Sequence, residues 1–525
     1  MYKWIVLLCL ASLAAAQVQP PFRVGSRLVT VDVVVRNEKG PVKGLTKDDF
    51  TITDKGKTRN IAVFDVSGGG DTGATPQALP ANVVSNRANA GGEESRTATA
   101  LLFDRLNIPA PLDQATVRTK VLAFLASLKS TDRIGFYSLG TTLSRVQDFN
   151  ENADPMVQAA KRLISPGQPP ASDARSQEAD ARLKDALTPI QQRDIRVRTT
   201  TTTQALRTIA RHLAGIPGHK NLIWVLSDFP LTFGEAADRR TNYTDEVATA
   251  VNIMNEANVT VHPMDPRGLT TSSAASSGAE PTTTREAVLM PGANASFGSA
   301  ANLGLSGTET MDAIAKATGG TSYYGMNDIG VPVRKVLDES AVSYTLGFYV
   351  EEKALDGKLH DLNVKLAKKP ETSGASARHR KTYAALNAQA ARQERPSLAE
   401  LVMDPLDATA VSIMATTAPS PSKPETHSVQ VKVNVAELEF EHRDDKWVAA
   451  FDLGMAIETP DRKVSNVLTV PTKLNLSDEE LKQGLASGLV IDSAVPSPAQ
   501  PGQLRVVIQD KTSGAAGSVR IPIAR

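Results

Sequence analysis

Apolar residues alternate with polar ones at the start of the chain, after the first 25 residues. In the segment RLVTVDVVVRNEKG they occupy every second position, at Val29, Val31, Val33 and Val35. This period predicts a half-buried strand that turns back at Gly40, and DDFTITDKGKTRNIAVFDV continues the pattern. A β module of about 50 residues buries too little surface to be stable alone. We therefore expect the module at 17–66 to be completed by strands at 341–385.

The pattern changes between residues 96 and 340, where short apolar segments alternate with amphipathic ones. ALLFD, RIGFYSLG, NLIWVLSDF and VTVHPMD predict strands, and segments such as QATVRTKVLAFLASLKS and DEVATAVNIMNEANV predict helices. Strands that are apolar on both faces are typical of a mostly parallel sheet covered by helices on both sides. The predicted fold is thus multidomain, with a central Rossmann-like α/β domain. Polar segments at 165–198 and 270–308 are expected to be insertions in it.

The rest of the chain returns to the period of strands. SVQVKVNVAELEFEHRDDKWVAAFDL alternates, and GQLRVVIQDKTSGAAGSVRIPI predicts a hairpin, so we expect an immunoglobulin-like all-β sandwich at 404–525. Gly, Ala, Asn, Thr and Pro dominate residues 67–95, which indicates a flexible linker. The charged stretch at 386–403 predicts a second linker or a helix.

The first residues, MYKWIVLLCLASLAAAQ, have the features of a secretory signal peptide that ends at Ala16. The single cysteine, Cys9, lies inside it, and Leu8 before it does not suit a lipoprotein signal. A chain cleaved at 16 has no cysteine, which excludes disulfides and thiolate metal sites. No other stretch approaches the roughly 18 apolar residues that cross a bilayer. We therefore expect a secreted or periplasmic protein without a transmembrane segment.

The charge balance argues against nucleic acid as a partner. The chain has 58 Lys and Arg residues against 57 Asp and Glu, and removal of Lys3 with the signal leaves 57 of each. Nucleic-acid binders normally have a strong basic excess. Aromatic residues, at 5%, are also too few for platforms on which bases would stack.

Two acidic residues come directly after predicted strands of the α/β domain. Asp104 ends ALLFD, and Asp228 follows the most apolar strand, NLIWVLSDF. Ligands of open α/β sheets bind beyond the carboxyl ends of the strands. Two carboxylates on that rim suit a hard cation such as Mg²⁺. The alternative interpretation is that both acids cap the turns that follow them, without a metal.

The α/β segment resembles a von Willebrand factor type A domain. LIWVLSDFP, ANVTVHPMDPRGL, ATGGTSYYGMNDI and AVSYTLGFYV occur in the order typical of the exported acidobacterial proteins related to that domain, which the chain resembles over residues 24–385. The resemblance implies a metal-ion-dependent adhesion site with two acids, a threonine and two serines. By position, the acids are Asp104 and Asp228, and the threonine is Thr200.

The chain departs from this pattern at the two serines, whose positions hold Leu106 and Ile108. Asn107 between them is the one residue that can replace their oxygen atoms. The predicted metal ligands are therefore Asp104, Asn107, Thr200 and Asp228, a degenerate set that would bind Mg²⁺ or Ca²⁺ weakly or not at all.

No arrangement of nucleophile, base and orienting group is recognisable in the sequence. A Gly-x-Ser-x-Gly elbow and a His-Glu-x-x-His motif are missing, and His212 and His219 are seven residues apart. The prediction is an exported, non-enzymatic binding or adhesion-type protein, without a catalytic residue and with an unknown extracytoplasmic protein partner. The alternatives are an envelope scaffold and a hydrolase whose site lies in the insertions.

Overall fold

The structure is a computed structural model of the 525-residue chain. The residues that it describes are 26–67, 79, 83–87, 97–108, 111–128, 134–149, 180–216, 218–227, 229, 232–233, 241–242, 244–266, 307–326, 328–339, 342–369, 372–387, 395–421, 423, 425–460 and 463–524. The predicted signal peptide, Asp228 and nearly all of the insertion expected at 270–308 lie outside these residues. None of the described helices is long and apolar enough to span a membrane.

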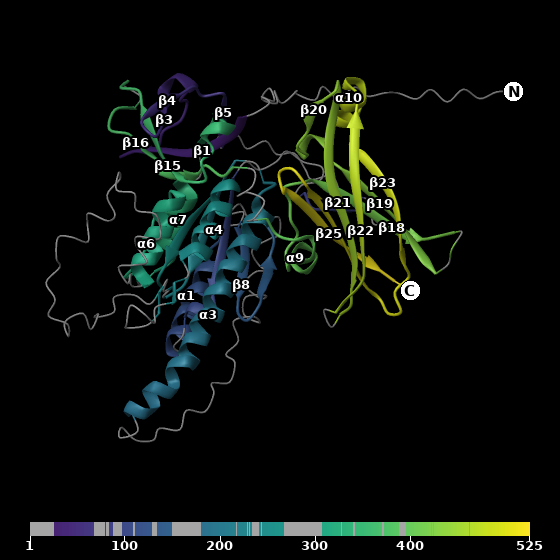
Figure 1. Ribbon diagram of the computed structural model, residues 1–525. Helices are drawn as coiled ribbons and strands as arrows, with labels where there is room; N and C mark the ends of the chain where they lie inside the picture. Colours follow the sequence, from purple (N-terminus) through teal and green to yellow (C-terminus); the bar gives the residue numbers. More distant parts are fainter. Residues whose placement is uncertain are drawn as a thin grey trace.

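Two sheets share the core of the first β module, which Figure 1 shows above the α/β domain. One sheet has the order β16-β1-β14-β5, with β2 beside β1: β16 (Ser376–Arg378), β1 (Ser26–Asn37), β14 (Ser343–Glu351), β5 (Val63–Ser67) and β2 (Gly40–Pro41). The other has the order β17-β15-β3-β4: β17 (Thr382–Ala384), β15 (Leu359–Leu366), β3 (Phe50–Asp54) and β4 (Lys57–Arg59). Short 3₁₀ turns lie at Lys47–Asp49 and Glu352–Ala354.

Each of these sheets joins strands from before and after the α/β domain. β1 pairs with β14 in antiparallel register from Ser26 opposite Glu351 to Val33 opposite Tyr344, and β3 pairs with β15. The alternating valines of β1 are buried in a core that also contains Phe348. The N-terminal strands therefore find their partner sheet in residues that follow the α/β domain.

The central sheet has the order β13-β10-β7-β8-β9, in which β9 alone is antiparallel to its neighbour. Its strands are β13 (Val259–Met264), β10 (His219–Val225), β7 (Thr97–Asp104), β8 (Ile134–Leu139) and β9 (Leu143–Gln147). The helices around it are α1 (Pro111–Ala126), α3 (Asp180–Leu213), α4 (Thr244–Glu256), α6 (Gly307–Thr318) and α7 (Gly330–Glu339). A separate pair of short strands is β11 (Thr232–Phe233) with β12 (Thr241–Asn242).

Both faces of the central sheet are covered. Leu102 of β7 belongs to one buried cluster with residues of α3, α4 and α6, whereas Leu101 and Phe103 belong to another with residues of α1 and α7. Neighbouring strand residues thus enter opposite cores, as the apolar character of both faces requires. Residues 180–198, expected within an insertion, form the first half of α3 because their helix continues without interruption into the segment that packs on the sheet.

The C-terminal module is a sandwich of two sheets around one apolar core. One sheet has the order β23-β19-β18-β6: β23 (Leu489–Pro496), β19 (Thr426–Val433), β18 (Ile413–Pro419) and β6 (Val83–Ser85). The other has the order β20-β21-β24-β25, with β22 also beside β21: β20 (Glu441–Arg443), β21 (Lys446–Glu458), β24 (Gly502–Asp510), β25 (Ala516–Ile523) and β22 (Val464–Leu476). Two helices and a 3₁₀ turn complete it: α9 (Leu398–Met403), α10 (Asp478–Ser487) and Val435–Glu437.

Strand β6 corrects the expectation of a continuous linker at 67–95. Residues 83–85 pair with β18 and so belong to the C-terminal sandwich. The side chain of Asn86 fixes this strand, because its amide donates to the carbonyls of Ala408 and Val411, each at 2.8 Å, and accepts from the backbone N–H of Ile413 at 2.8 Å. The composition of residues 67–95 cannot predict such contacts, because they are made with residues far away in the sequence.

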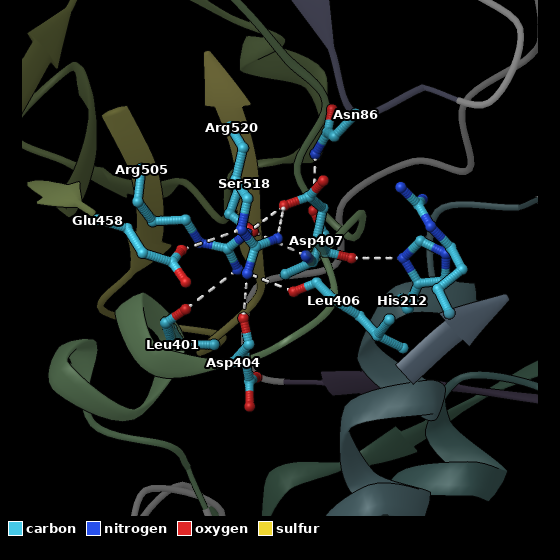
Figure 2. A network of polar contacts seen from close by, with 12 residues as sticks. Asn86, His212, Leu401, Asp404, Leu406, Asp407, Glu458, Arg505, Ser518 and Arg520 are labelled. Atoms are coloured by element: carbon cyan, nitrogen blue, oxygen red, sulfur yellow. Dashed lines mark hydrogen bonds and ion pairs between the residues drawn. The ribbon is translucent and has the colours of Figure 1, made fainter. Parts of the chain in front are cut away.

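The loop at 404–409 joins the C-terminal sandwich to the end of α3 (Figure 2). The His212 ring lies 2.7 Å from the carbonyl of Asp407, and Arg211 binds the Asp404 carboxylate at 2.8 Å. The Thr409 hydroxyl accepts from the backbone N–H of Gly215 at 2.8 Å. Because the two modules approach so closely here, a Cβ atom on Gly215 would lie 2.1 Å from the carbonyl oxygen of Thr409.

We predict that Gly215→Ala separates these modules, because a Cβ atom cannot share this space with a backbone carbonyl. The expected result is faster proteolysis between the α/β domain and the sandwich, measured by limited digestion of the purified chain. Gly140→Ala is the matched control, since its Cβ would meet only the end of Arg105, at 3.9 Å or more. Equal digestion rates for both variants and the wild type would contradict the prediction.

Candidate functional site

The candidate site lies at the carboxyl ends of the central strands, where β7 ends at Asp104. A 3₁₀ turn, η2 (Arg105–Asn107), follows, and the Asp104 carboxylate accepts from the backbone N–H of Asn107 at 3.2 Å. The carbonyl of Asn107 accepts from the N–H of Ser227, at 2.9 Å, in the segment after β10. Asp104 thus caps the turn that leaves its strand, and the turn contacts the end of the neighbouring strand.

Side chains of the protein surround the Asp104 carboxylate. Oδ2 accepts from the Trp224 indole N–H at 2.9 Å and from the side-chain amide of Asn107 at 2.6 Å. Asp104, Asn107 and Trp224 are each at most 1% exposed. Trp224 comes from β10, so its indole spans from the neighbouring strand to the carboxylate.

Burial raises the pKa of Asp104 to about 6, because removal from water disfavours the charged form. The hydrogen bonds from Asn107 and Trp224, together with the positive charge of Arg198, act in the opposite direction and favour the carboxylate. Desolvation is the larger effect. Asp104 is therefore an acid whose charge changes near neutral pH inside a closed polar cluster.

Helix α3 supplies the other side of this cluster. Arg198 donates to Oδ1 of Asn107 at 3.0 Å, and the Asn107 amide donates to the Thr202 hydroxyl at 2.8 Å. Arg198 and Thr202 are four residues apart and so lie on one face of the helix. Thr202 is fully buried, whereas Thr200 is exposed and donates to Glu246 at 3.2 Å. The threonine that the structure brings to Asn107 is Thr202 instead of the expected Thr200.

The donor set described here does not fit a divalent ion. Asp104 uses both of its oxygen atoms as acceptors for protein donors, and Asn107 directs its N–H groups at Asp104 and Thr202 and its oxygen at Arg198. Mg²⁺ and Ca²⁺ need several oxygen atoms that converge on one point. In the part of the chain that the structure describes, no group of three or more His, Cys, Asp or Glu side chains is placed to hold a metal. Asp228 lies outside that part.

The two histidines considered in the sequence have separate contacts. His212 lies against the carbonyl of Asp407, and burial lowers its pKa. His219 lies at the opposite end of the sheet, 3.1 Å from the side-chain oxygen of Asn221 and 3.4 Å from Asp32 of the first β module. Both contribute to contacts between modules.

Three residues of the cluster are not among those that the sequence predicts for the site: Trp224, Arg198 and Thr202. The four-residue spacing of Arg198 and Thr202 is a signal for one helical face, but the polar composition of residues 165–198 predicts an insertion there instead. Trp224 reads as an apolar residue of a strand, and nothing in its neighbours indicates that its N–H meets a carboxylate.

Comparison with known proteins yields no family model that matches the chain and no match among curated proteins. Solved structures that resemble it include an aerotolerance-related membrane protein from Bacteroides fragilis (10% identity, 47% of this chain and 98% of that one, TM-score 0.24). Others are proximal thread matrix protein 1 from the mussel byssus (9%, 47% of each chain, 0.25) and a von Willebrand factor type A protein from Catenulispora acidiphila (9%, 96% and 75%, 0.25). The chain thus spans about half the length of the byssus protein. At TM-scores this low, the likeness carries no argument about fold or activity.

Titration of Asp104 predicts a pH dependence of stability. Its pKa is raised from 3.8 to about 6, so the stability that it contributes is complete below about pH 4 and is lost as the pH rises through 6. Relative to Asp104→Asn, the unfolding free energy of the wild type should therefore fall between pH 4 and 7, by at most about 3 kcal/mol at roughly 1.4 kcal/mol per pKa unit. Urea unfolding of both proteins across this range is the measurement. A difference that does not change with pH would contradict the assignment.

Proposed function

We propose that this chain is an exported, non-enzymatic binding protein of adhesion type, which uses the carboxyl ends of its central strands as a binding face. The ordered segments that resemble a von Willebrand factor type A domain support this function. The sheet itself supports the location, because the crevice beyond the carboxyl ends of parallel strands is where ligands of such sheets bind. The partner that we propose is a protein outside the cytoplasm.

The observation that carries the proposal is that the Asp104 carboxyl group is shielded from solvent. A general acid or base must reach the proton that it transfers, directly or through one water. Asp104 is fully buried, and its oxygen atoms already accept hydrogen bonds from Asn107 and Trp224. Such a group suits the support of a binding face better than it suits catalysis.

Exposed side chains near the buried Asp104 cluster would contact the protein partner. Thr200 is exposed in the middle of α3, between Arg198 and Thr202, and donates to Glu246 of α4. Arg105 and Leu106 of η2, directly after Asp104, are half-buried. The rim therefore offers charged, polar and apolar groups on a backbone that buried contacts fix, which favours recognition without large rearrangement.

Thr200→Arg tests the face, because a bulky cation there alters the surface without touching the buried cluster. We expect at least a tenfold loss in the amount of partner that the immobilised chain retains from an extracytoplasmic extract, measured by quantitative mass spectrometry. Thr51→Arg, at an exposed position of β3, is the matched control and should retain the partner. Addition of EDTA should change nothing. Hydrolytic turnover by the purified chain, lost in one point variant, would refute the proposal.

A further inference from the structure

The cluster around Asp104 contains a positive charge of its own. We propose that the Arg198 guanidinium takes the place of the divalent ion that the resemblance to von Willebrand factor type A domains implies, so that the rim is complete without a metal. The proposal concerns the charge balance of the rim and stands whether or not a protein partner is found.

The first step of the argument is the need for a cation. An ionised carboxylate that is withdrawn from water is costly unless a positive charge or several hydrogen bonds compensate it. Asp104 is completely buried. The hydrogen bonds from Asn107 and Trp224 favour its ionised form most, and the positive charge of Arg198 adds to them.

The second step is the position of Arg198. Arg198 extends from α3 and donates to the amide oxygen of Asn107 at 3.0 Å. The same helix contains Thr200, the metal-binding threonine that the resemblance implies. Asn107 in turn donates to Asp104 at 2.6 Å. The Asn107 amide thus links the guanidinium to the carboxylate through two hydrogen bonds. In the sequence, Asn107 lies between Leu106 and Ile108, which occupy the positions of the two metal-binding serines.

The third step is that the guanidinium and a divalent ion exclude one another. Asn107 would have to turn its oxygen toward a metal, which would place its N–H groups against the donors of Arg198 and leave the Thr202 hydroxyl without this donor. The same conflict fixes the orientation of the amide in the structure, since only one of its two orientations gives every contact a donor and an acceptor.

Removal of the guanidinium should create a metal site. We expect Arg198→Ser to bind Mn²⁺ at pH 8 with a dissociation constant of about 1 mM or tighter, measured by electron paramagnetic resonance, and the double variant with Asp104→Asn to lose that binding. The wild type should show no Mn²⁺ binding that depends on Asp104. Arg198→Lys retains the charge and should behave like the wild type.

Arg207→Ser is the matched control on the same helix, because Arg207 binds the Glu246 carbonyl at 3.0 Å, away from Asp104. It should gain no Mn²⁺ site. Thermal stability supplies a second measurement: the fall in melting temperature caused by Arg198→Ser should be at least halved in the Asp104→Asn background, because the charge to be compensated is gone.

Two results would overturn the proposal. One is Mn²⁺ binding by the wild type that is lost in Asp104→Asn. The other is an Arg198→Ser variant that gains no Mn²⁺ site and whose effect on melting temperature is additive with that of Asp104→Asn. If Arg198→Ser does not fold alone, the proposal requires that the double variant folds, and failure of both while Arg207→Ser folds would count against it.

Discussion

The arrangement of the modules depends on one buried guanidinium, that of Arg505 in β24. It is 1% exposed, and it binds the Asp407 carboxylate and the carbonyls of Leu401 and Leu406. Burial lowers its pKa to about 10, yet it stays charged at neutral pH. Loss of one partner of such a buried pair is costly, because the other charge remains without compensation. These contacts hold the loop at 404–409 against the sandwich, where Asp404 and Asp407 meet α3.

Helix α3 connects this contact to the candidate site. Its last turn holds Arg211 and His212 against the loop, whereas its middle holds Arg198 and Thr202 against Asn107. A helix is stiff over this distance because every peptide group between is bound along the axis. Helix α3 thus joins the α/β domain to the C-terminal sandwich at its last turn and to the rim of its own sheet at its middle, and the apolar cores supply the bulk of the stability.

The sequence predicts those features that depend on local period and misses those that depend on distant contacts. The alternating valines of β1 indicate a strand that needs a partner sheet, and β14 supplies it. Asp104 is recognisable because an acid at the end of an apolar strand is unusual. Thr202 was passed over for Thr200 because a run of threonines has no local signal for the one that faces inward. β6 was missed for a related reason, since a strand of three residues exists only through its pairing with β18.

The pairing of β1 with β14 has a consequence for how the chain is made. Synthesis proceeds from the N-terminus, so β1 leaves the ribosome long before the sequence of its partner, β14, has been made. Closing so long a loop is slow, and contacts of high sequence separation form late in folding. The valine-rich edge of β1 must therefore remain unpaired for most of synthesis, when it can pair with other chains. The topology thus exposes an aggregation-prone strand throughout synthesis, whereas the folded protein buries its valines.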